Sequence, residues 1–122
     1  MKSIPCEVAG LKGIEVPGQG PPLLFIHGNS ANHLTFEPLF ASPTLAGRHL
    51  VALDLPGHGA SSPPASVSVR GLSAAIGEAA AALDAGVAVG HSLGGHLILQ
   101  ALGHGLLPQV RGVVVMNTPP IP

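Results

Sequence analysis

The sequence predicts an α/β domain of three layers, in which a mainly parallel sheet is flanked by helices. Short apolar runs that stop at Gly or Pro alternate with stretches of helical periodicity, as in consecutive βα units. The chain has 122 residues, about the size of one domain, and 46% of them are hydrophobic. Only 9% are charged, whereas a disordered chain needs the opposite balance.

The strands are predicted by apolar runs of two kinds. Residues 2–20 combine short extended pieces with Gly and Pro, which favours an antiparallel hairpin. The later runs are continuously apolar, as expected for strands buried on both faces. These runs span residues 23–27, 49–55, 86–90 and 110–116. None approaches the roughly 20 apolar residues of a membrane-spanning helix, so no membrane span is expected.

The clearest helix is predicted over residues 69–83. Apolar residues recur there at steps of three and four, which describes an amphipathic helix. Ser66 or Ser68 is expected to cap its start, and Gly86 to stop its end.

Two further helices are expected. Residues 93–102 are apolar almost all round, so this helix is expected to be largely buried. Residues 34–45 predict a short helix that is interrupted by Pro38 and Pro43.

Composition excludes several classes of function. Five Lys and Arg against six Asp and Glu give a net charge of −1, so no basic face is available for nucleic acid. The single cysteine, Cys6, excludes an internal disulfide and a thiolate zinc cluster. The first ten residues lack an apolar signal region, and we therefore expect a cytoplasmic protein.

The strongest chemical motif is Gly90-His91-Ser92-Leu93-Gly94, which reads G-x-S-x-G between a predicted strand and a predicted helix. Such a turn lifts the Ser92 hydroxyl above the sheet edge as a nucleophile. The Leu93 N–H then faces the place where an acyl oxygen becomes negative. His91 is expected to point away. The alternative is a serine that only caps a glycine-rich helix start.

Two other loops follow predicted strands. In His27-Gly28-Asn29-Ser30, the backbone N–H of Asn29 is a candidate second oxyanion donor, and the alternative is an ordinary βα turn. In the run DLPGHGASS, the Asp54 carboxylate is expected to tie down a sharp turn by accepting backbone N–H bonds. His58 in the same loop is a minor candidate for catalysis, because a histidine between glycines is usually solvated.

Together, HGNS, DLPGHGASS and GHSLGGH resemble the α/β-hydrolase superfamily, in its esterase, lipase and thioesterase-like branch. The resemblance implies that Ser92 is the nucleophile and that the amides of Asn29 and Leu93 form the oxyanion hole. It implies hydrolysis of a small-molecule carboxylic ester or thioester, with no metal or organic cofactor. It also implies an incomplete hydrolase fold, with about six of eight strands and no lid.

The family order is nucleophile, acid, histidine. No Asp or Glu follows Ser92, Asn117 stands where the family sometimes places its acid, and His96 and His104 fall on a predicted helix. No residue is therefore assigned as triad acid or triad histidine. Residues 1–122 are interpreted as the amino-terminal part of a truncated or partial hydrolase domain.

Two other interpretations stay open. The chain is either an intact small hydrolase with an improvised pair such as Ser92 and His58, or a non-catalytic binding module or half-subunit completed by another chain. In the partial-domain interpretation, Val110 to Met116 is a hydrophobic edge strand without an outer neighbour. Self-association through this edge is expected.

Overall fold

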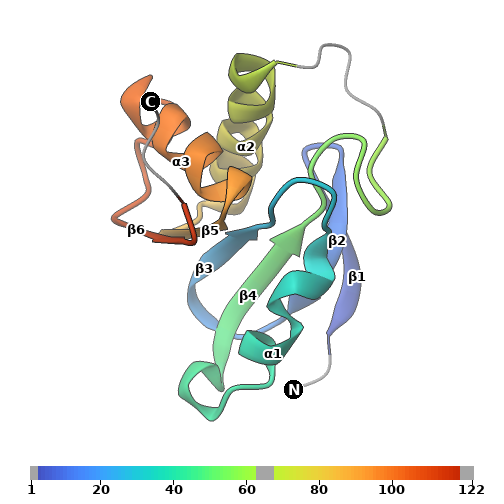
Figure 1. Cartoon of the computed structure of the whole chain (residues 1–122). Coiled ribbons are helices and arrows are strands. Elements are labelled where there is room, and N and C mark those ends of the chain that lie inside the picture. The colour runs from blue at the N-terminus through green and yellow to red at the C-terminus, as the bar shows by residue number, and fades with distance from the viewer. Residues whose placement is uncertain (1–2, 63–67, 119–122) are drawn as a thin grey trace.

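The computed structural model describes residues 3–62 and 68–118, and it confirms the α/β architecture (Figure 1). Six strands form one sheet in the order β1-β2-β4-β3-β5-β6. They are β1 (Ile4–Val8), β2 (Leu11–Val16), β3 (Gln19–Ile26), β4 (Arg48–Leu53), β5 (Val87–His91) and β6 (Gly112–Met116). The first hairpin and the β2–β4 pair are antiparallel, and the other pairs are parallel. The carboxyl ends of β3, β4 and β5 therefore meet at one edge, where ligands of open α/β sheets bind.

Helices cover both faces of the sheet, because successive strand residues point to opposite sides. Leu24 and Ile26 join the core beneath α2 (Val69–Leu83) and α3 (Leu93–Gly103). Phe25, between them in sequence, joins the second core on the other face, beside α1 (Glu37–Phe40) (Figure 1). The run that predicts a strand buried on both faces is thus confirmed.

The start of α2 is as predicted, but its end is not. The Ser68 hydroxyl accepts the Gly71 N–H at 2.9 Å, and Ser66 lies outside the described residues. The helix ends at Leu83, and Asp84 adopts a left-handed conformation with φ of 53°. Gly86 is therefore not the stop residue. Asp tolerates this conformation better than most residues, and its N–H closes the last turn.

The segment over residues 34–45 forms three short turns instead of one helix. Two 3-10 turns, His33–Phe36 and Pro43–Leu45, flank the single turn of α1. Pro38 lies in the first turn of α1, where a missing N–H costs nothing.

Helix α3 is less buried than its composition predicts. Leu97 and Ile98 are fully buried, whereas Leu99 and Leu102 are 41% and 46% exposed. Helix α3 packs on α2, β5 and β6, and β6 has no outer neighbour in the described part of the chain. No helix within the described ranges has the length and apolar character needed to span a membrane.

Candidate active site

Ser92 occupies the tight turn between β5 and α3. Strand β5 ends at His91, α3 begins at Leu93, and Ser92 itself has φ of 55° and ψ of −118°. This region is costly for a residue with a side chain, so the surrounding structure must hold Ser92 there. The Ser92 N–H donates to the Met116 carbonyl at 2.8 Å, and the Ser92 carbonyl accepts the Gly95 N–H at 3.0 Å. The strand-to-helix turn predicted from the G-x-S-x-G motif is confirmed.

The glycines around Ser92 are required by close approaches of the backbone. A Cβ added to Gly90 would lie 2.6 Å from the Gly95 Cα. One added to Gly94 would lie 2.2 Å from the Ile26 carbonyl oxygen, at the end of β3. The start of α3 therefore sits directly against two strands, and any larger residue would push the turn away from its place.

The turn after β3 lies beside Ser92, because β3 pairs with β5 and Ile26 is the partner of Gly90. A Cβ on Gly28 would be 3.2 Å from the Ser92 Cβ. Neither Asn29 nor Leu93 donates its N–H to a backbone carbonyl within residues 3–62 and 68–118. For Leu93 this follows from its place at the start of α3, where N–H groups lack an intrahelical acceptor. Within the described residues, both amides named as candidate oxyanion donors are therefore left without a backbone acceptor.

His27 is a buried residue of this site that the sequence did not single out. Its Nδ1 lies 2.6 Å from the Gly28 carbonyl oxygen, and its Nε2 accepts the Leu55 N–H at 2.9 Å. Because an amide N–H only donates, the ring proton must be on Nδ1, where it donates to Gly28. Burial lowers the pKa of His27 below its ordinary value, so the ring is neutral at pH 7. The available signal was a histidine directly after a buried strand.

Asp54 is fully buried at the end of β4 and anchors its loop as predicted. Its carboxylate accepts the Ala60 N–H at 3.0 Å. It also accepts the backbone N–H and the ring Nδ1–H of His33, each at 2.8 Å, a partner that the sequence did not reveal. Burial alone would raise the pKa of Asp54, but these hydrogen bonds outweigh it and hold the pKa below its ordinary value.

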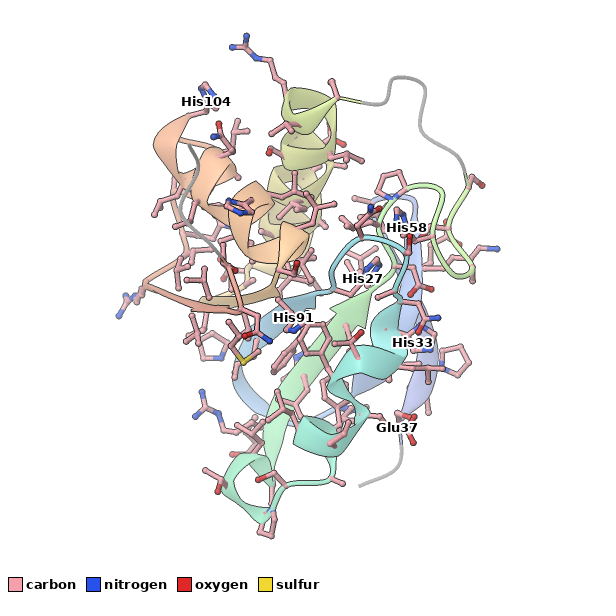
Figure 2. All side chains as sticks on the ribbon, in the orientation of Figure 1. His27, His33, Glu37, His58, His91 and His104 are labelled. Carbon is pink, nitrogen blue, oxygen red and sulfur yellow. The ribbon has the colours of Figure 1, made fainter. Side chains whose placement is uncertain are left out.

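His58 packs on His27 instead of reaching the serine. The two ring centroids are 5.1 Å apart, and His58 Nδ1 donates to the Pro56 carbonyl at 3.1 Å. In Figure 2, His27 lies between His58 and His91. Across the two described ranges, no hydrogen bond joins a histidine ring to the Ser92 hydroxyl.

Residues 23–122 match the alpha/beta hydrolase family. The chain belongs to this family. Among curated relatives, it is 38% identical over 108 residues to the pimeloyl-[acyl-carrier protein] methyl ester esterase of Xylella fastidiosa (strain 9a5c), covering 88% of this chain and 40% of the relative. The esterase of the same name from Stenotrophomonas maltophilia (strain K279a) is 40% identical over 110 residues, covering 88% of this chain and 39% of the relative. The chain thus spans about 40% of the length of these curated relatives.

Solved structures of α/β hydrolases superimpose on nearly the whole chain. An N-acyl homoserine lactonase, AidH, in its E219G form with N-hexanoyl homoserine, gives a TM-score of 0.80 at 30% identity, covering 98% of this chain and 46% of AidH. A bacterial membrane phospholipase A gives a TM-score of 0.78 at 30% sequence identity, covering 99% of this chain and 41% of the phospholipase. The epoxide hydrolase VrEH1 from Vigna radiata gives a TM-score of 0.79 at 24% sequence identity, covering 99% of this chain and 41% of VrEH1. At this identity the likeness supports the fold alone.

Within the described residues, His91, His96 and His104 of this α/β hydrolase make no hydrogen bond to the Ser92 side chain. The His91 Nδ1 lies 3.6 Å from the place of a Gly28 Cβ, and its Nε2 lies 3.3 Å from Asn117 Nδ2. That this side chain points away from Ser92 stays a prediction. His96 keeps its Nδ1 buried without a described partner. His104 is exposed at the end of α3.

Two further features of the described part of this α/β hydrolase concern metal-binding groups and the thiol. No group of three His, Cys, Asp or Glu side chains is arranged there to hold a metal ion. Burial raises the pKa of Cys6 to about 11, helped by the charges of Glu15 and Asp54. Its thiol therefore stays protonated at neutral pH and is a poor nucleophile.

Proposed function

We propose that this chain supplies the nucleophile and the oxyanion hole of a serine hydrolase that cleaves carboxylic esters or thioesters. The observation that carries the proposal is the backbone of Ser92, held at φ of 55° between β5 and α3. Ser92 is half-buried. A strained backbone conformation is retained only where the surroundings enforce it, and such residues cluster at active sites. The two free amides of Asn29 and Leu93 support the same assignment.

The reaction follows from this geometry. The Ser92 Oγ attacks the carbonyl carbon, and its proton passes to a base. The carbonyl oxygen becomes negative between the N–H groups of Asn29 and Leu93, which stabilise it without reorganising. The bond to the alcohol or thiol then breaks and the leaving group takes the proton. Water attacks the acyl-serine, which releases the acid and restores Ser92.

No described histidine is hydrogen-bonded to the Ser92 hydroxyl, so the base that takes the serine proton has to come from elsewhere. We propose that a segment outside these residues contributes the acid and the histidine. This is supported by the chain's 40% share of its relatives' length. Because those relatives are pimeloyl-[acyl-carrier protein] methyl ester esterases, we infer a methyl ester of a carrier-bound acyl chain as substrate. A cytoplasmic site for the reaction, expected because the first ten residues lack an apolar signal region, is part of the same proposal.

A fluorophosphonate tests the nucleophile directly. Imidazole in the buffer takes the serine proton, the oxygen–phosphorus bond forms, and fluoride leaves. Mass spectrometry is expected to find one adduct, on Ser92, and none in Ser92→Ala. Ser30→Ala is the matched control, because Ser30 also has a left-handed backbone, with φ of 60°, in the neighbouring turn. An adduct on another serine, or no adduct, overturns the proposal and favours a non-catalytic binding module.

A further inference from the structure

We propose that His27 is the positioning residue of the oxyanion hole: its ring fixes the peptide plane that carries the Asn29 N–H, and the loop after β4 holds the ring. This inference rests on the proposed function of Ser92. It also gives a role to the DLPGHGASS motif, which the hydrolysis step itself does not use.

The first step is the bond from His27 Nδ1 to the Gly28 carbonyl oxygen, at 2.6 Å. That carbonyl and the Asn29 N–H belong to one planar trans peptide unit, so they point in opposite directions. Fixing the oxygen therefore fixes the direction of the N–H. The same oxygen also accepts the Ala31 N–H at 3.3 Å, which leaves this peptide little freedom to rotate.

The second step is the set of contacts that hold the ring of His27. The imidazole is fully buried, and its Nε2 accepts the Leu55 N–H, the first amide after Asp54. The His58 ring packs against it at 50° between planes. Beside it, the bonds from His33 to Asp54 tie the same two loops together a second time. Figure 2 shows His27, His33 and His58 gathered on this side of the sheet edge.

The third step is that one protonation state alone serves both bonds. A neutral ring with its proton on Nδ1 donates to Gly28 and accepts from Leu55. A ring with its proton on Nε2 would place two donors against each other at Leu55 and two acceptors at Gly28. The buried site thus selects the tautomer that orients the oxyanion peptide.

Two substitutions separate the two bonds. In His27→Asn the amide nitrogen takes the place of Nδ1 and keeps the bond to Gly28. In His27→Gln the side-chain oxygen takes the place of Nε2 and keeps only the bond to Leu55. Each variant loses one buried hydrogen bond, so the two variants are expected to have similar free energies of unfolding. We measure the rate at which a fluorophosphonate labels Ser92 in imidazole.

His27→Asn is expected to label close to the native rate, and His27→Gln about 10- to 100-fold more slowly, as expected for a displaced oxyanion donor. Equal rates in the two variants overturn the positioning role. If the native chain is not labelled at all, the proposed function fails instead.

A second measurement needs neither labelling nor a variant. Nitrogen-15 NMR of the native histidine rings, at a concentration where the chain is monomeric, distinguishes the two neutral tautomers. A His27 ring with its proton on Nδ1 supports the proposal. A proton on Nε2, or a charged ring at pH 7, overturns it.

Discussion

Gly28 and Ser92 face each other across the carboxyl ends of β3 and β5, so closely that a Cβ on Gly28 would lie 3.2 Å from the Ser92 Cβ. Two turns that are more than 60 residues apart in sequence thereby form one site. This contact sets the position of the Ser92 hydroxyl relative to the Asn29 N–H.

Gly28→Ala is therefore expected to slow the labelling of Ser92 by about tenfold, because a displaced reacting group loses rate steeply. The cost in stability is expected to be small, about 1 kcal/mol, since the contact is tight but not impossible. The control is Gly103→Ala at the end of α3, where an added Cβ meets nothing within 4 Å. That variant is expected to label at the native rate, and an equal loss in both would contradict the prediction.

The chain by itself is expected to be nearly inert toward p-nitrophenyl acetate without imidazole. A serine hydroxyl needs a base at neutral pH, and loss of the histidine costs about 10⁶ in turnover in serine proteases. Ser92→Ala should then change the rate very little. Turnover by the native chain well above background would contradict this prediction. If Ser92→Ala and either His58→Ala or His96→Ala then each abolish that activity, the serine and that histidine act as a catalytic pair.

The stability of the fold is expected to fall below pH 6.5 because of His27. Burial lowers the pKa of His27 from 6.5, so the unfolded chain binds this proton more readily than the native chain does. The stability that the neutral His27 ring contributes is complete above pH 6.5 and is lost as the pH falls toward the pKa of His27 in the native chain. Urea unfolding between pH 7 and pH 5 measures it. His27→Gln, which cannot titrate, should show a smaller drop; an unchanged drop would assign the effect elsewhere.

Asp54→Asn is expected to destabilise the fold by about 2–3 kcal/mol at pH 7, because a buried carboxylate loses charge-assisted bonds from His33 and Ala60. The native pKa of Asp54 lies below 3.8, so its contribution is complete above pH 3.8 and is lost below that value. Asp84→Asn is the matched control, since Asp84 is exposed and Asn also tolerates its left-handed backbone. Equal losses in both variants would argue against the buried network.

The open edge of β6 is expected to make the chain self-associate. Val114 and Val115 are 49% and 40% exposed on this strand, and unpaired edges recruit further strands. Analytical ultracentrifugation should show concentration-dependent association that Val114→Lys weakens. Val69→Lys, on α2, tests whether any exposed valine matters, because Val69 is 50% exposed. A clean native monomer at high micromolar concentration would refute the expectation.

The fold was predictable because its signals are local. Apolar runs such as Leu23 to Ile26 identify buried strands. Gly90 and Gly94 are required because a Cβ on either would lie 2.6 Å or less from another part of the backbone. The roles of His27 and His33 were not predictable, because they depend on which loops face each other after β3 and β4. The end of α2 was missed for a different reason: Asp84 adopts a conformation for which Gly86 was the better candidate by propensity.

The bond from the Ser92 N–H to the Met116 carbonyl, at 2.8 Å, has a consequence for amide hydrogen exchange. Ser92 follows β5, an interior strand, yet its amide proton is protected by β6, an edge strand. Edge strands open at lower free energy than interior ones. The Ser92 amide should therefore exchange with solvent deuterium together with β6, much faster than the amide of Val89, whose N–H points to the interior strand β3. The exchange rate at the serine thus reports the fraying of an edge 24 residues further along the chain.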